Sequence, residues 1–155
     1  MPAEPSLRLA IEDDPSEADI GTVRQNLTDF NSGHVGEDHY LPLAVFLRNE
    51  MGAVVAGLSG VTFWDWLVVD LLWVREDLRG RGIGGKLLET AEGEAIRRGC
   101  IGVFLDTQDF QAPAFYRKHG YSVFGELPDL PPGHVRYYLA KRFDVAMGEG
   151  GASDD

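Results

Sequence analysis

The sequence predicts an α/β fold in which a mixed sheet carries helices on both faces. Short runs rich in β-branched and aromatic residues alternate with longer runs whose apolar residues recur at helical spacing. A glycine-rich segment, residues 79–86, lies between one run of each kind, as in turns that lead from a strand into a helix. The predicted order of elements is β-α-loop-β-β-β-α-β-α-β-β.

In the first half of the chain, residues 6–11 form the first predicted strand. A helix follows: Asp14 can cap it, Pro15 lies in its first turn, and it runs to about residue 30. After a polar loop, strands are expected at 43–48, 53–63 and 66–74, the first two joined by a hairpin turn at 49–52.

In the second half, a helix is predicted over 83–98, because its apolar residues recur three and four positions apart. The continuous apolar run 101–107 is typical of a strand buried on both faces. The remaining elements are a short helix at 111–119, stopped by Gly120, and strands at 121–127 and 135–143 with a stiff loop between them.

Length and composition indicate one domain over 1–145, because 155 residues with 44% hydrophobic content can bury a proper core. We expect the acidic, glycine-rich tail, 146–155, to be disordered. There is no apolar run long enough to span a bilayer and no signal-peptide pattern. The single cysteine, Cys100, cannot form an internal disulfide, so we expect a reducing, cytoplasmic setting.

The formal net charge of −11 makes nucleic acid and anionic membranes poor partners, and it favours a cationic amine as substrate. The histidines have no spacing typical of metal ligands, so no metal is expected.

The glycine-rich segment predicts a phosphate site. A glycine turn that opens a helix exposes backbone N–H groups at the positive end of the helix dipole, and Arg79 and Arg81 add positive charge. A Walker A loop is disfavoured, because Leu87 stands where the magnesium-binding hydroxyl should be. A Rossmann fingerprint fits the glycine spacing, with Asp106 at about the distance of its acidic residue, but the loop comes too late in the chain.

A third interpretation rests on Arg79, Gly82 and Gly84, which fill the pattern Arg/Gln-x-x-Gly-x-Gly/Ala. Together with the flanking residues 74–78 and 87–88, this segment resembles the acetyl-coenzyme A signature of the GNAT superfamily of N-acetyltransferases. Residues 115–121 (Phe-Tyr-Arg-Lys-His-Gly-Tyr) independently resemble that family's Phe-Tyr-x-x-x-Gly-Phe/Tyr element. The resemblance covers about residues 6–143.

The resemblance implies a mostly antiparallel sheet with a splayed central strand pair, acetyl-CoA as co-substrate, and compatibility with a homodimer. The arm of the coenzyme would lie between the splayed strands, and its diphosphate would lie on the glycine turn. The coenzyme-binding residues that follow are Leu72, Trp73, Val74, Arg79, Gly80, Arg81, Gly82, Ile83, Gly84, Gly85, Gln111, Phe115 and Tyr116.

The resemblance also implies catalytic roles. Tyr116 would protonate the departing thiolate, and the N–H of Leu72 would stabilise the oxyanion. The base is open between Asp70, which interrupts an apolar run, His134, and a water. The family often has an asparagine where this chain has Asp109, and either Gln108 or Gln111 could supply the missing amide.

The sequence therefore predicts an N-acetyltransferase that moves an acetyl group from acetyl-CoA to the primary amine of a small molecule by direct attack on the thioester. The alternative is a non-catalytic acyl-CoA sensor or interaction module on the same fold.

Overall fold

The computed structural model describes residues 5–144. Its internal contacts divide the chain into two compact units, Met1–Glu37 and Asp38–Asp155, and each is described here by itself. The predicted tail, 146–155, lies outside the described residues. No helix among residues 5–144 is long and apolar enough to cross a membrane.

The first unit contains helix α1, Glu17–Val35. Its cap is Ser16, whose hydroxyl oxygen accepts from the Asp19 N–H at 3.0 Å, so the predicted cap at Asp14 is wrong. The helix also continues beyond the predicted end near residue 30, and it stops at Gly36, which has a φ of +81°. Residues 31–35 continue the helix although several of them are polar, whereas Gly36 supplies the backbone angle that ends it.

The predicted strand over residues 6–11 is also wrong, since this segment has no regular structure and its apolar side chains are exposed. A strand forms only where its backbone groups pair with a neighbour. Within residues 5–144 the sheet ends at β1, with no strand outside it.

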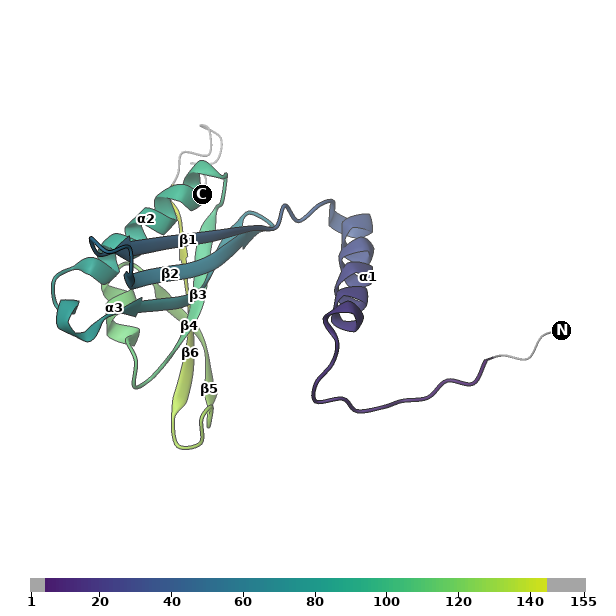
Figure 1. The fold of residues 1–155 in the computed structure, drawn as a ribbon. Helices are drawn as coiled ribbons and strands as arrows, with labels where there is room; N and C mark the ends of the chain where they lie inside the picture. The colour runs from purple at the N-terminus through teal and green to yellow at the C-terminus, as the bar shows by residue number, and fades with distance from the viewer. Residues whose placement is uncertain (1–4, 145–155) are drawn as a thin grey trace. The chain divides into compact units, whose positions relative to one another are not determined.

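The second unit is built on a six-stranded sheet in the order β1-β2-β3-β4-β6-β5 (Figure 1). All neighbouring strands are antiparallel except β3 and β4, which are parallel. The mixed, mostly antiparallel fold is therefore confirmed, and the Rossmann interpretation is wrong because that fold requires a mostly parallel sheet. The strands are β1 (Leu41–Arg48), β2 (Val54–Phe63), β3 (Trp66–Val74), β4 (Gly102–Gln108), β5 (Ser122–Pro128) and β6 (Val135–Arg142).

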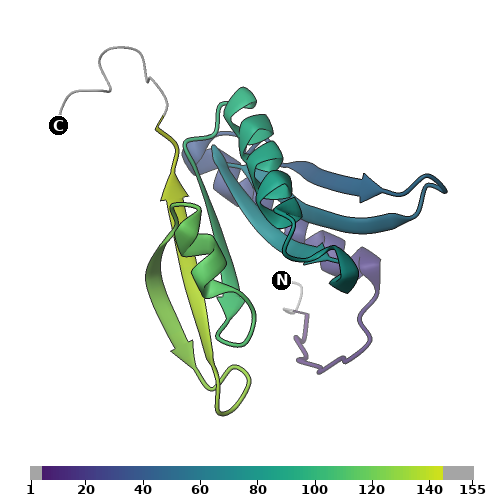
Figure 2. The ribbon, with the colours of Figure 1, turned by 90° about the vertical axis from the view of Figure 1, so that its left-hand side faces the viewer.

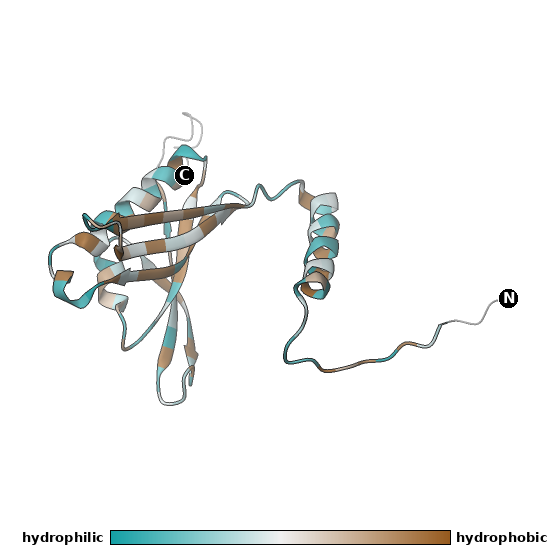
Figure 3. Cartoon of the chain, viewed as in Figure 1, coloured by the Kyte–Doolittle hydropathy of each residue, from teal (hydrophilic) through white to brown (hydrophobic). Residues whose placement is uncertain are grey.

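Two helices of this unit, α2 (Ile83–Arg97) and α3 (Pro113–Lys118), lie over the same face of the sheet (Figure 2). Apolar residues of α2 one turn apart, among them Leu88, Ala91 and Ala95, are fully buried against the strands. β1 and β3 are hydrophobic along most of their length (Figure 3). Cys100 is buried in the same core, and burial raises the pKa of its thiol, so it packs as a small apolar residue.

A β-bulge interrupts the pairing of β2 with β3. Ser59 pairs with Leu71 and Gly60 pairs with Val69, so Asp70 has no partner on β2. The bulge changes which positions of β3 face the core. Leu67 and Val69 lie in the core before it, whereas Leu72 and Val74 pack against the core after it. Gly60 is required opposite the bulge, since a Cβ there would collide with the carbonyl oxygen of Val68.

The parallel strands β3 and β4 pair only over Trp66–Val69 and Gly102–Leu105. Beyond this point the two strands separate, as Figure 2 shows, and the expected splayed pair is confirmed. The first residues past the last pair are Asp70 on β3 and Asp106 on β4. Backbone groups of β3 that would otherwise bond to β4 are thus left facing the opening.

Candidate active site

A cleft of about 1080 Å³ begins where β3 and β4 separate and runs to the start of α2. Its walls are the end of β3, the glycine-rich turn, the end of β4 and helix α3. This is where open α/β sheets generally hold ligands, since strand ends leave backbone groups unpaired and helices begin nearby.

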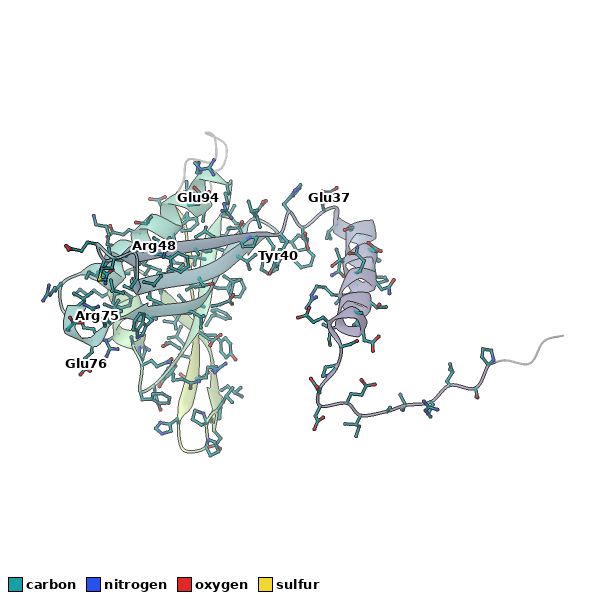
Figure 4. All side chains as sticks on the ribbon, in the orientation of Figure 1. Glu37, Tyr40, Arg48, Arg75, Glu76 and Glu94 are labelled. Carbon is teal, nitrogen blue, oxygen red and sulfur yellow. The ribbon has the colours of Figure 1, made fainter. Side chains whose placement is uncertain are left out.

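The glycine-rich turn forms one end of the cleft. After β3 the chain passes through Arg75 into a short 3-10 helix, Glu76–Leu78; Figure 4 labels Arg75 and Glu76. Gly80 and Gly82 have φ values of +80° and +81°, a region that side chains disfavour. Gly82 is the N-cap of α2 and provides no side-chain cap, so the first N–H groups of that helix remain available to an anion.

Arg79 is held at this end of the cleft. Its Nε donates to the carbonyl oxygen of Val74 at 2.8 Å, which folds the side chain back along the end of β3. The guanidinium therefore lies beside the turn at a fixed position and retains other N–H groups for a ligand.

Helix α3 packs directly on the first turn of α2, and this packing is a second reason for the glycines there. A Cβ at Gly84 would lie 3.3 Å from the Phe115 ring, and one at Gly85 would lie 2.9 Å from Cε1 of His119. The rings of Phe115 and His119 also contact each other, with centroids 4.7 Å apart. No local pattern predicts this contact, because it joins residues about thirty positions apart.

Tyr116 lies in the wall of the cleft on α3. Its side chain is 7% exposed, and its ring contacts Phe115 and Tyr121. Burial, with a smaller contribution from the negative charge of Asp106, raises the pKa of Tyr116 to about 12. Among the described residues its hydroxyl has no hydrogen-bond partner, so a protonated phenol is available to a ligand in the cleft.

The two ends of the cleft differ in charge. Arg79, Lys86 and Lys118 line the end beside the turn, with Glu89 one turn further along α2. Asp70 and Asp106 line the end where the strands part. The arrangement suits an anionic group at the first end and a cationic group at the second.

Polar residues at the end of β4 settle which glutamine reaches the cleft. The Gln111 side-chain oxygen accepts from the Gln108 N–H at 2.7 Å and from the Thr107 hydroxyl at 3.2 Å, and Gln111 lines the cleft. Gln108 is buried. When its amide is oriented so that both atoms have partners, the nitrogen donates to the Leu130 carbonyl and the oxygen accepts from the Arg136 guanidinium. Gln111 is thus the one in position to meet a ligand.

Asp109, which stands where the related family often has asparagine, binds the start of β6. Its Oδ1 lies 2.9 Å from Nδ1 of His134, and its Oδ2 accepts from the Val135 N–H at 2.9 Å. The His134 ring also meets the edge of Phe110, with centroids 4.9 Å apart. Phe110 lines the cleft, whereas His134 does not.

The structure brings most of the predicted site residues together. The cleft is lined by Asp70, Leu72, Trp73, Val74, Arg79, Gly80, Gly82, Ile83, Gly84, Gly85, Gln111, Phe115 and Tyr116, while Arg81 and His134 are not among its lining residues.

Sequence reasoning missed Asp106, Phe110 and His119 as lining residues. The signal available for Asp106 was its place in the strand after the long helix, at the level where the parallel partner strand reaches Asp70. Nothing in the sequence marked the other two, because Phe110 and His119 reach the cleft only through the packing of α3 and the β5–β6 hairpin.

Comparison with known proteins agrees with this geometry. The model of the acetyltransferase (GNAT) family matches residues 8–121. The blasticidin-S acetyltransferase of Streptomyces morookaense is 44% identical over 99 residues, which are 63% of this chain and 73% of that protein.

Two solved structures extend the comparison. A crystal structure from Agrobacterium tumefaciens, assigned as an acetyltransferase, superposes with a TM-score of 0.84 and 36% identity, covering 88% of this chain and 100% of that one. An aminoglycoside 6′-N-acetyltransferase in complex with coenzyme A has the same fold, with a TM-score of 0.58 and 21% identity over 65% of this chain and 72% of that one.

Proposed function

The chain belongs to the GNAT family of acetyltransferases and is an acyltransferase, and we propose that it moves an acetyl group from acetyl-CoA to the primary amine of a small molecule. The observation that carries this proposal is the cleft between β3 and β4. It joins an uncapped, glycine-rich helix start to a buried, protonated tyrosine. The coenzyme A bound to a protein of the same fold supports the choice of acyl carrier.

The residues of the cleft fit such a carrier. Gly80 and Gly82 leave open space where a Cβ would be, so a diphosphate can approach the N–H groups of Arg81, Gly82 and the first turn of α2. Arg79 would pair with the same phosphates. The backbone of Leu72, Trp73 and Val74 faces the opening and would bond the pantetheine amides as a neighbouring strand does, with Gln111 and Phe115 on the opposite wall.

In the transfer, the amine nitrogen bonds to the thioester carbonyl carbon as the carbon–sulfur bond breaks. Tyr116 donates its proton to the departing sulfur and recovers one from solvent. The N–H of Leu72 stabilises the negative charge that develops on the carbonyl oxygen. The amine gives up a proton to a base, for which Asp70, His134 and a water at the mouth of the cleft are the candidates.

The acceptor is a small amine that carries positive charge. Asp70 and Asp106 at the open end of the cleft, together with a formal net charge of −11, favour a cation there. The blasticidin-S and aminoglycoside acetyltransferases are named for small molecules, which supports a small molecule as acceptor.

A thiol-release assay tests the proposal. Purified protein is mixed with acetyl-CoA and a panel of small amines, and free coenzyme A is detected with a thiol reagent. We expect release that depends on one group of cationic amines and saturates in both substrates. Calorimetry that detects no saturable binding of acetyl-CoA would refute the proposal.

The same assay separates the enzyme from an acyl-CoA sensor. A sensor would bind acetyl-CoA with ordinary saturation but would release no thiol with any amine. The unpartnered hydroxyl of Tyr116 in the cleft favours the enzyme, because a sensor has no use for a proton donor at that position.

A further inference from the structure

A buried carboxylate on α2 takes no part in the proposed chemistry. Glu92 lies on the side of the helix that faces the core, one turn from Leu88 and from Ala95, and it is 9% exposed. Burial of a charged group costs free energy unless partners satisfy it. An apolar residue would suit this position of an amphipathic helix, so the fold alone does not call for a carboxylate here.

Glu92 has two partners, which come from distant parts of the chain. Its Oε2 accepts from the Tyr121 hydroxyl at 2.6 Å, and its Oε1 accepts from Nζ of Lys141 on β6 at 2.9 Å. Burial and the Glu92 carboxylate raise the pKa of Tyr121, so the phenol keeps the proton that it donates. We refer to Glu92, Tyr121 and Lys141 as the Glu92 network.

The Glu92 network holds the C-terminal end of α3. Nζ of Lys141 also donates to the carbonyl oxygen of His119, the C-cap of α3, at 3.0 Å. The Tyr121 N–H donates to the carbonyl oxygen of Tyr116 at 3.1 Å, and the rings of these two tyrosines meet edge to face with centroids 5.7 Å apart. Tyr121 is therefore the one residue between Glu92 and Tyr116.

Helix α3 needs such anchors because it is short. It has six residues, and no side chain caps its start. A helix of this length is not stable by itself, so tertiary contacts decide where it lies. The three side chains of the Glu92 network are not among the residues that line the cleft, whereas Tyr116 and His119 are. Any effect of the network on the reaction must therefore act through the position of α3.

We propose that Glu92 is a positioning residue, which acts through Tyr121 and Lys141 to fix α3 so that the Tyr116 hydroxyl stands where the departing sulfur needs it. This inference rests on the proposed acetyl transfer, in which Tyr116 protonates that sulfur. Displacement of a reacting group by about 1 Å can cost about 100-fold in rate. Binding of the carrier depends instead on β3 and the glycine-rich turn, so it should be largely independent of the network.

The effect on position can be separated from the effect on stability. Replacement of a buried ionic group and its partners by apolar residues of similar volume is often neutral or stabilising. A triple variant, Glu92→Leu with Tyr121→Phe and Lys141→Met, keeps most of the volume of the network and removes its directional bonds. We expect this variant to unfold close to the wild-type midpoint.

The matched control is Glu94→Leu with Arg97→Met, which replaces a neighbouring ion pair of α2 by the same residue types. The Glu94 carboxylate bonds Arg97 and Arg98, both on its own helix or its cap, and neither residue of the control lines the cleft. Tyr121→Phe alone removes one hydroxyl and keeps the ring, so it carries the same test if the triple variant does not fold.

Steady-state kinetics measures kcat, and calorimetry measures the Kd for acetyl-CoA. We expect kcat to fall about 10-fold or more in the triple variant and about threefold in Tyr121→Phe, while the Kd changes less than about twofold. The control should keep the wild-type kcat. In a Tyr116→Phe background the triple variant should cause no further loss, because the proton donor that the network positions is already absent.

A wild-type kcat in the triple variant, or a fall by the same factor with and without the Tyr116 hydroxyl, would overturn the proposal. If the wild-type protein acetylates no amine, the proposed function fails instead, and amide hydrogen exchange still tests the anchoring of α3. Faster exchange of the His119 and Tyr121 N–H groups in the triple variant than in the control supports the anchoring, and equal exchange refutes it.

Discussion

Tyr116 combines the two properties that protonation of a leaving thiolate requires. Its ring is buried in a rigid contact with Phe115 and Tyr121, and its pKa, raised to about 12, keeps the phenol protonated at neutral pH. A hydroxyl that already donates to a protein group could not serve in this way. Tyr121 is such a case, since it donates to Glu92 at 2.6 Å.

For Tyr116→Phe we expect kcat to fall about 100-fold or more, because the sulfur must then leave without a proton donor. The dissociation constant for acetyl-CoA should change less than about twofold, since the ring and the backbone stay in place. Steady-state kinetics and calorimetry measure the two effects. Tyr138→Phe, whose hydroxyl lies outside the cleft, is the control. A kcat equal to wild type would remove Tyr116 from this role.

The raised pKa of Tyr116 also has a consequence for stability. The unfolded chain loses the phenolic proton near pH 10, whereas the folded protein keeps it to about 12. The stabilisation is therefore complete below about pH 10 and is lost as the pH rises toward 12, in total about 2–3 kcal/mol. Urea unfolding should show the free energy of the wild type falling more steeply above pH 10 than that of Tyr116→Phe; parallel curves would contradict this.

Single residues show where sequence reasoning succeeds and where it stops. Gly82 could be predicted as a helix cap, because a glycine turn before an apolar helical pattern has a local physical cause. Asp70 could be singled out as a charge in an apolar strand. The bond from Asp109 to His134 could not, because it joins residues 25 positions apart and depends on how the β5–β6 hairpin folds back.

At the scale of elements, the bulge in β3 positions the site. It shifts the face on which later side chains lie, so that Leu72 and Val74 pack against the core while Leu71 and Trp73 are exposed. A strict alternation of side chains would put every second position of β3 on the core face along its whole length, so the sequence pattern alone does not predict this change. The predicted strand at 6–11 fails for a different reason. Its local sequence pattern suits a strand, but it has no neighbouring strand to pair with.

We predict that Gly60→Ala destabilises the protein by about 2–4 kcal/mol, because the new methyl group meets the backbone carbonyl of Val68 opposite the bulge. Gly93→Ala is the matched control in α2, where open space surrounds the position, and it should stabilise by about 0.5–1 kcal/mol. Urea unfolding of both variants measures the difference. Equal stabilities would mean that the bulge is not tightly constrained.

At the scale of the whole molecule, the net charge of −11 and the polarity of the cleft act together. Under the proposed function, the excess negative charge would attract a cationic acceptor over a distance, and the basic groups at the turn would hold an anionic carrier that the net charge repels. The mostly antiparallel sheet and the splayed strand pair could be predicted because they follow from the family pattern. That residues 1–145 form a single domain remains a prediction.

Salt should therefore weaken the capture of a cationic acceptor more than that of an uncharged one. We expect kcat/KM for a cationic acceptor to fall severalfold from low to high ionic strength, because screening removes the long-range attraction. A neutral salt series with kinetics at saturating acetyl-CoA measures this. An uncharged, similarly sized acceptor is the control, and the same salt dependence for both acceptors would show that charge does not guide the substrate.

The most direct test of the whole account is a crystal structure of the protein with acetyl-CoA. We predict the diphosphate on the N–H groups at residues 81–85, the pantetheine arm beside β3, and the sulfur within hydrogen-bond distance of the Tyr116 hydroxyl. A carrier bound elsewhere, or a sulfur on the side of the molecule away from Tyr116, would contradict it.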